Sequence, residues 1–150
     1  MGITKRLEAL NIALEKLPER KMLEPVMQVD NLIFTSGQVS ASQGRLVSAG
    51  KIGRDVTVED GQRAARQSVI NCLSALNDYL GSLDDIKRIV KITGFIQCSE
   101  DFTEQRAIMD AASELLHSIF GEKGKHARTG VGVYKLPLNA SVEIEMIVEV

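Results

Sequence analysis

The sequence predicts an α+β domain in which two long helices pack on one face of a mixed sheet. The chain ends in two runs that alternate between apolar and polar residues, as strands with one buried face do. Before these runs, two long segments repeat apolar residues at helical spacing, and a segment rich in β-branched residues separates them. Two helices and one sheet bury their apolar faces most simply when both helices lie on the same side.

The length and composition are those of one domain that needs no disulfide or metal to fold. The chain has 150 residues, of which 44% are hydrophobic and 25% are charged, and both values are ordinary for a globular protein. No internal repeat, linker or low-complexity tract divides the chain. We therefore expect residues 1–150 to form a single domain.

Charge and residue counts argue against partners such as nucleic acids and membranes. The formal net charge is -2, and four Phe, two Tyr and no Trp leave few platforms on which bases could stack. No apolar run reaches membrane-spanning length, and no signal peptide is evident. We expect no nucleic-acid partner and no membrane partner.

The cysteines and histidines predict a reducing compartment and no metal. Cys72 and Cys98 are too few for a disulfide framework, which is typical of reduced thiols in a cytoplasmic protein. No cysteine or histidine cluster has metal-ligand spacing, and no glycine loop has the pattern of a phosphate site. We therefore expect no metal and no cofactor.

The first part of the chain predicts a helix, a connector and a hairpin. Leucines recur near helical spacing over residues 3–17, and Pro18 ends this helix. A connector covers residues 19–30. Short strands are expected at residues 31–35 and 45–47, joined by a serine-rich loop as a β-hairpin.

The middle of the chain predicts helix, strand and helix. Thr57 can cap a helix that runs to about Leu80 and stops at Gly81. A strand follows over residues 86–96, and Gly121 ends the second helix. With the C-terminal strands, the predicted order after the first helix is β-β-α-β-α-β-β.

Two C-terminal strands carry the candidate site. Residues 125–134 and 141–150 alternate in polarity, and the short connection between them predicts an antiparallel hairpin. The first strand is expected to turn one face to the core, made of Thr129, Val131 and Val133. Arg128 and Glu143 then share the outer face, where Gly130 leaves floor space. A cation, a carboxylate and bare backbone are a plausible seat for a small carboxylate ligand.

Four motifs occur in a fixed order along the chain, with a helix or strand expected between them. They are Asn31-Leu32-Ile33-Phe34-Thr35-Ser36-Gly37-Gln38, Ala127-Arg128, Leu136-Pro137 and Val142-Glu143-Ile144-Glu145. This order resembles the YjgF/Rid family, the reactive intermediate (imine/enamine) deaminases, also called the endoribonuclease L-PSP family. The match covers about residues 26–150, so the resemblance implies a common core there and an added N-terminal helix at about residues 3–17.

The resemblance implies a chorismate-mutase-like fold and a homotrimer with ligand clefts between subunits. It implies that Arg128 binds the carboxylate of a small imino or keto acid and that Glu143 holds the water for imine hydrolysis. Ser36 falls on the serine of the family's Ser-Gly-Gln turn, where it lines the cleft or stabilises the turn. His126 shares the strand parity of Arg128 and is either a substrate-binding group or a solvated loop histidine. Gly130 completes the expected substrate-binding set.

Three positions depart from the deaminase pattern. Gly130 stands where the deaminases have a cysteine, and residues 23–28 contain no tyrosine. Asp110 is the nearest counterpart of an asparagine early in the second helix. The chain is therefore similar to a divergent branch of the family.

Three functions are open from the sequence. The first is hydrolysis of reactive imine or enamine acids to keto acids and ammonia, with Arg128 on the carboxylate and Glu143 as the base. The second is a non-catalytic regulatory trimer that binds a metabolite carboxylate, which the departure at Gly130 favours. The third is an endoribonuclease, against which the acidic composition argues.

Overall fold

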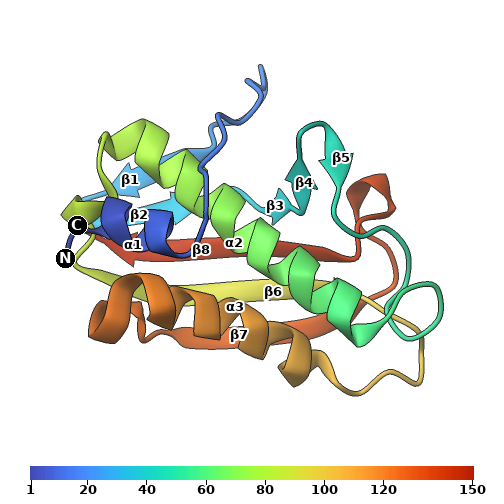
Figure 1. The fold of residues 1–150 in the computed structure, drawn as a ribbon. Helices are drawn as coiled ribbons and strands as arrows, with labels where there is room; N and C mark the ends of the chain where they lie inside the picture. The colour runs from blue at the N-terminus through green and yellow to red at the C-terminus, as the bar shows by residue number, and fades with distance from the viewer.

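The computed structural model describes all 150 residues, and Figure 1 labels the elements. The helices are α1 (Ile3–Ala9), α2 (Val58–Leu80) and α3 (Gln105–Phe120), with 3-10 turns η1 (Leu83–Asp85), η2 (Gly121–Gly124) and η3 (Pro137–Asn139). The strands are β1 (Val26–Val29), β2 (Leu32–Thr35), β3 (Gln38–Val39), β4 (Ala41–Ser42), β5 (Arg45–Leu46), β6 (Arg88–Gln97), β7 (Ala127–Val133) and β8 (Val142–Glu149). No helix combines the length and the apolar character that a membrane span requires.

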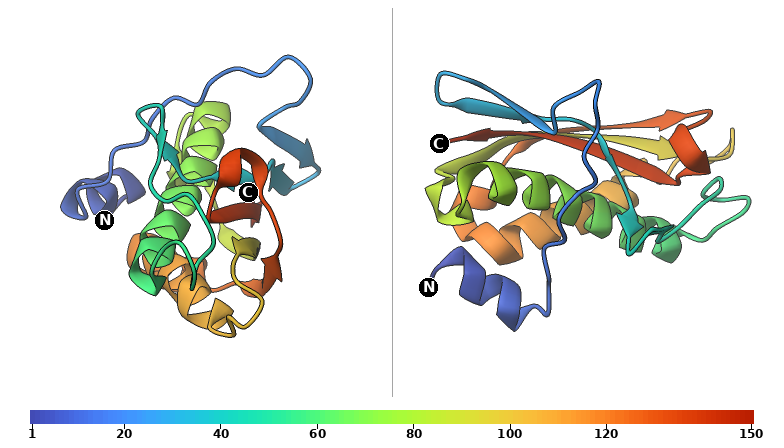
Figure 2. Two further views of the ribbon diagram at one scale, coloured as in Figure 1. Left: turned by 90° about the vertical axis from the view of Figure 1, so that its right-hand side faces the viewer. Right: turned by 90° about the horizontal axis from the view of Figure 1, so that it is seen from above.

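Six strands form one mixed sheet. Five of them lie in the order β1-β2-β8-β6-β7, and β3 also pairs with β8. Only β6 and β7 run parallel, and β7 is an edge strand. Figure 2 shows α2 and α3 on one face of this sheet and no helix on the other face. The predicted α+β arrangement, with both long helices on one face of a mixed sheet, is confirmed.

The core lies between the two long helices and the sheet. It is one cluster of 28 buried hydrophobic residues, to which β8 contributes every second position: Val142, Ile144, Met146 and Val148. Fully burying a side chain of this size contributes about 1.5–3 kcal/mol, so this layer holds the helices to the sheet.

Cys72 and Cys98 are buried and form no disulfide. Burial raises the pKa of the Cys72 thiol to about 12, so it stays protonated.

α2 begins and ends where the sequence predicts. The hydroxyl of Thr57 accepts a hydrogen bond from the backbone N–H of Asp60 at 3.1 Å, and the Asp60 carboxylate accepts one from the backbone N–H of Thr57 at 3.1 Å. This reciprocal pair satisfies donors that the first turn of a helix leaves free. Gly81 ends α2 in the left-handed conformation, with φ 81°.

The first hairpin differs from the predicted one. β1, expected to be connector, pairs antiparallel with β2 across a two-residue turn, Asp30 and Asn31. Asp30 has φ 53°, which turns of this length favour and Asp tolerates. β5, the expected partner of β2, instead pairs with β4 in a separate two-stranded sheet.

The two C-terminal strands do not pair with each other, so the predicted hairpin is wrong. β7 lies parallel on one side of β6, and β8 lies antiparallel on the other side. α3 is the crossover helix that brings the chain back parallel to β6.

The predicted faces are also reversed in β7. Arg128 is level with buried Ile92 on the helix side, whereas Thr129 and Val131 are exposed on the opposite face.

α1 is shorter than the predicted helix of residues 3–17. It ends at Ala9, and Asn11 follows in the left-handed conformation with φ 56°, which a helix cannot continue. Further along, Glu15 accepts a hydrogen bond from the Ser42 hydroxyl at 2.6 Å. This contact ties the segment after α1 to the β4–β5 turn.

Candidate functional site

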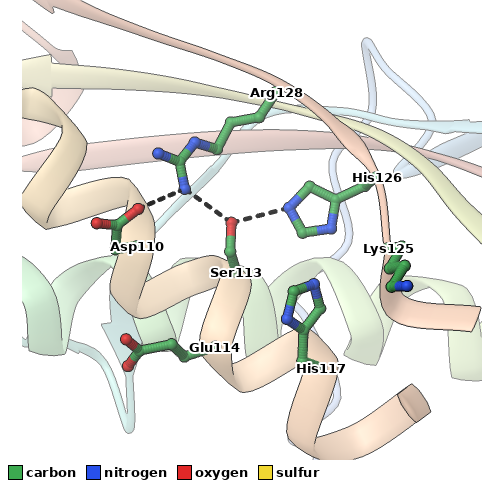
Figure 3. A pocket seen from close by; sticks show the side chains of 7 residues that line it. All are labelled: Asp110, Ser113, Glu114, His117, Lys125, His126 and Arg128. Atoms are coloured by element: carbon green, nitrogen blue, oxygen red, sulfur yellow. Dashed lines mark hydrogen bonds and ion pairs between the residues drawn. The ribbon is translucent and has the colours of Figure 1, made fainter. Parts of the chain in front are cut away.

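A polar pocket of about 550 Å³ lies between α3 and the start of β7 (Figure 3). No hydrophobic side chain lines it. Because β7 is the edge strand of the sheet, this pocket lies at the margin of the molecule. Its lining residues are Asp110, Ser113, Glu114, His117, Lys125, His126 and Arg128. Such a lining suits a small and charged ligand.

α3 turns a polar stripe toward this pocket. Asp110, Ser113 and His117 are three and four residues apart, which places them on one face of the helix. Ile108 and Met109 lie on the buried side. Ser113 is not among the site residues that the sequence predicts. The recurrence of polar, chemically versatile residues at helical spacing was the signal available for it.

Arg128 is the fixed cation of the pocket. Its Nη1 donates to Asp110 Oδ1 at 2.8 Å and to Ser113 Oγ at 3.0 Å, and its side chain is 26% exposed. The carboxylate partner of Arg128 in the structure is therefore Asp110, not Glu143. The guanidinium makes no other hydrogen bond, so the N–H groups at Nε and Nη2 remain available to a ligand. Two contacts to α3 hold the guanidinium in place before any ligand arrives.

His126 lies in the same pocket, half-buried, with both ring nitrogens engaged. Nδ1 lies 2.5 Å from the carbonyl oxygen of Gly124, and Nε2 lies 2.8 Å from Ser113 Oγ. A carbonyl oxygen only accepts, so Nδ1 carries the proton and, in the neutral ring, Nε2 accepts from the serine hydroxyl. Burial lowers the pKa of His126. The hydrogen bond to Gly124 acts in the opposite direction and raises this pKa, whereas the charges of His117 and Arg128 lower it. The ring is therefore neutral at pH 7.

Glu143 lies on the opposite face of the sheet from Arg128. It is paired with Phe95 on β6, whereas Arg128 is level with Ile92, and an odd number of positions along a strand reverses the face. The prediction that Arg128 and Glu143 share a face is wrong for a single chain. Burial, and secondarily the charge of Glu145, raises the pKa of Glu143.

The Ser-Gly-Gln turn accompanies Glu143 and not Arg128. A Cβ on Gly37 would lie 2.8 Å from Glu143 Oε1, so the bare backbone of the turn packs directly against that carboxylate. The hydroxyl of Ser36 donates to the carbonyl oxygen of Glu24 at 2.6 Å. Ser36 thus stabilises the turn. Arg128 and His126 form one group of predicted residues, and Glu143 and Ser36 form another.

Gly130 leaves less space than expected. It lies on the helix side of β7, level with Gly94 of β6. The side chain of Met109 occupies the room above both glycines, and a Cβ on Gly130 would lie 2.7 Å from Met109 Cγ. The space that was predicted for a ligand at Gly130 is therefore filled by the buried side chain of Met109.

The pocket lining carries charges of both signs. Arg128 supplies positive charge and Lys125 is paired with Glu122 at 2.8 Å, while Asp110 and Glu114 add negative charge (Figure 3). A ligand carboxylate can accept hydrogen bonds from the free N–H groups at Nε and Nη2 of Arg128, in the planar, bidentate manner that arginine favours. No group of three or more His, Cys, Asp or Glu side chains could hold a metal ion.

Fold and site together define an α+β protein of the chorismate-mutase-like class with a polar pocket at the sheet edge. A family model described as "YjgF/chorismate mutase-like, putative endoribonuclease" matches residues 6–150. The chain therefore belongs to the YjgF/chorismate-mutase-like family, as the sequence motifs predict.

Individual relatives agree with this assignment. Protein TCP17 of Trypanosoma cruzi is 41% identical over 118 residues, which cover 78% of this chain and 74% of that protein. A crystal structure from Shewanella oneidensis MR-1, with the same endoribonuclease description, is 32% identical, covers all of both chains and has a TM-score of 0.96. The crystal structure of E. coli TdcF with bound serine has a TM-score of 0.66 at 21% identity, covering 92% of this chain and 95% of that one. This last likeness shows the fold alone.

Proposed function

We propose that the protein binds a small carboxylate metabolite at Arg128 and hydrolyses reactive imine or enamine acids to keto acids and ammonia. The observation that carries the proposal is the Arg128 guanidinium, held by Asp110 and Ser113 with two sides free in a polar pocket. Serine in the TdcF structure is an amino-acid carboxylate held by the same fold, which supports a ligand of this kind. An imine is already activated toward water, so the reaction needs no cofactor.

The proposed hydrolysis requires a second copy of the chain. Glu143, the expected base for water, lies on the sheet face that no helix covers, away from Arg128 of the same chain. That face exposes apolar side chains, among them Phe34 at 41% and Val131 at 40% exposure. A homotrimer that covers this face would bring Glu143 of one copy toward the pocket edge of another. The raised pKa of Glu143 suits a group that exchanges a proton with water.

Pyruvate titration of wild type and Arg128→Ala tests carboxylate binding. A charge-assisted hydrogen bond contributes roughly 1.5–3 kcal/mol, so loss of the guanidinium should weaken pyruvate by about ten- to a hundredfold. Arg128→Lys should restore part of the affinity, because an ammonium lacks the planar fork. Arg63→Ala is the matched control, since it removes a guanidinium from an exposed ion pair with Asp60 on α2. Unchanged affinity of Arg128→Ala, with a large fall in melting temperature, would contradict the proposal.

A non-catalytic, carboxylate-sensing trimer is the second candidate. The separation of Glu143 from Arg128 within one chain favours it, as does the absence of a thiol at Gly130. Ammonia release from freshly generated imino acids separates the two candidates. Release that Glu143→Gln abolishes supports the hydrolase, and pyruvate binding without release supports the sensor. An RNA substrate is disfavoured, because Asp110 and Glu114 would repel a polyanion at this pocket.

A further inference from the structure

Ser113, His126 and Gly124 form a connected chain of hydrogen bonds beside the Arg128 guanidinium. The hydroxyl of Ser113 donates to His126 Nε2 at 2.8 Å, and His126 Nδ1 donates to the carbonyl of Gly124 at 2.5 Å. A nucleophile, a base within hydrogen-bond reach and a third group that orients the base make the geometric signature of an activated serine. In Figure 3, Ser113 lies between His126 and Arg128, facing both.

The backbone at Gly124 positions the His126 ring for its hydrogen bond with Ser113. A Cβ on Gly124 would collide with the carbonyl oxygen of Leu116, so only glycine lets η2 approach α3 so closely. This approach sets the carbonyl of Gly124 under Nδ1 and fixes the tautomer in which Nε2 is the base. Arg128 Nη1 donates to Ser113 Oγ at 3.0 Å, which stabilises negative charge developing on that oxygen. Ser113 lines the pocket, so a ligand can reach it.

We propose that Ser113 is a nucleophile activated by His126, and that this pocket hydrolyses small acyl esters that carry an anionic group. The substrate class follows from the lining. No hydrophobic side chain is present to hold an alkyl chain. The free N–H groups at Nε and Nη2 of Arg128 would attract an anion, whereas Lys125 is paired with Glu122 at 2.8 Å. The proposal rests on the proposed function in one respect, because both place an anionic ligand in the Arg128 pocket.

The reaction balances without any further reactant than water. Ser113 Oγ forms a bond to the acyl carbon while its proton passes to His126 Nε2. The bond from that carbon to the alcohol oxygen then breaks, and the leaving oxygen takes the proton from Nε2. Water attacks the acyl-serine with His126 again as the base, which releases the acid and restores the hydroxyl of Ser113.

The direct test is acylation by p-nitrophenyl acetate. Wild type should release a burst of p-nitrophenolate equal to the protein concentration, and peptide mapping after an acid quench should find the acetyl group on Ser113. Ser113→Ala should abolish both signals. Ser118→Ala is the matched control and should abolish neither, because its hydroxyl bonds the Glu114 carbonyl on the same helix and lies outside the pocket.

Further variants separate chemistry from folding. His126→Gln should slow the burst by roughly a hundredfold or more, because it removes the general base. Ser113→Cys keeps a nucleophile beside His126 and should carry the acetyl group at that position, even if Ser113→Ala folds poorly. The wild-type rate should fall as the pH drops through the pKa of His126, which lies below the ordinary imidazole value, because a protonated ring cannot accept the serine proton. 4-Acetoxybenzoate should react faster than its neutral methyl ester if the anionic group is recognised.

The outcomes distinguish this proposal from the proposed function. Absence of an acetyl group on Ser113 in folded wild type, or an unchanged burst in Ser113→Ala, would overturn the nucleophile while pyruvate binding at Arg128 stands. Equal rates for 4-acetoxybenzoate and its methyl ester would overturn the anionic substrate class. Acetylation of Ser113 in a protein that does not bind pyruvate would support Ser113 as the nucleophile and contradict the proposed metabolite site at Arg128.

Discussion

At the scale of single residues, the pocket contains a built-in competitor for its ligand. The Asp110 carboxylate occupies one side of the Arg128 guanidinium, and the Asp110 side chain is 58% exposed. An ion pair this exposed contributes little to stability, because water and salt screen it. Its main effect is on an incoming carboxylate, which meets a like charge at the rim of the pocket.

Asp110→Asn should therefore tighten pyruvate binding. An exposed ion pair is worth up to about 1 kcal/mol, so the gain should reach at most about fivefold. Calorimetric titration measures it, and Asp78→Asn provides the same charge change at an exposed position of α2 outside the pocket. Weaker binding in Asp110→Asn would mean that Asp110 orients Arg128 more than it competes with the ligand.

Met109 and Gly130 make a second residue-scale prediction. Gly130→Ala would place a Cβ 2.7 Å from Met109 Cγ, and overpacking of this kind lowers the free energy of unfolding by about 1–3 kcal/mol. Gly132→Ala meets Cys98 Sγ at the looser distance of 3.0 Å and should cost less. In a double-mutant cycle followed by urea unfolding, Met109→Ala should relieve the Gly130→Ala penalty. Strictly additive losses would show that the two residues do not compete for space.

At the scale of elements, α2 depends on its capping box. Thr57→Ala removes the oxygen that accepts from the Asp60 N–H, which should lower the free energy of unfolding by about 1 kcal/mol. Thr103→Ala, at an exposed position before α3, removes a similar hydroxyl without a cap and should cost less in the same unfolding experiment. Equal losses in the two variants would show that the cap does not stabilise α2 specifically.

At the scale of the whole molecule, the uncovered sheet face is the expected contact between copies. Met27 is 59% exposed and Phe34 is 41% exposed on this face, where they are cross-strand partners. Neighbouring exposed apolar side chains mark contact surfaces between proteins. Val131→Asp should disrupt the proposed trimer, because it would bury an unpaired charge between copies. Light scattering at micromolar concentration measures the mass of the variant and of wild type.

A second variant tests whether an added charge on the surface disrupts the assembly only when it lies on the uncovered sheet face. Leu10→Asp also introduces a carboxylate at an apolar residue, which is 41% exposed and directly follows α1. Figure 2 shows α1 on the same side of the sheet as α2 and α3. Leu10→Asp should leave the assembly intact. Wild type that is monomeric would contradict the trimer and remove Glu143 from the Arg128 pocket. Ammonia release, if present, would then need another base.

Local patterns in the sequence were sufficient for the class of fold. The bounds of α2 follow from Thr57 and Gly81, because caps and left-handed glycines act on neighbouring residues alone. Period-two alternation correctly groups Val142, Ile144 and Val148 on one buried face of β8. The ordered motifs identify the family, which the matched family model confirms. They also place Arg128 at a site that the structure shows to be a polar pocket.

The tertiary structure alone decided which strands are neighbours and which face each strand turns to the helices. Alternation groups residues within a strand, but it carries no information about the partner strand or the covered side, because pairing is made between distant segments. The sequence therefore predicted that Arg128 and Glu143 share one face of neighbouring strands, whereas β6 lies between their strands and their side chains lie on opposite faces of the sheet. For the same reason, Ser113 became a site residue only when α3 was packed against β7, where its hydroxyl meets His126 and Arg128.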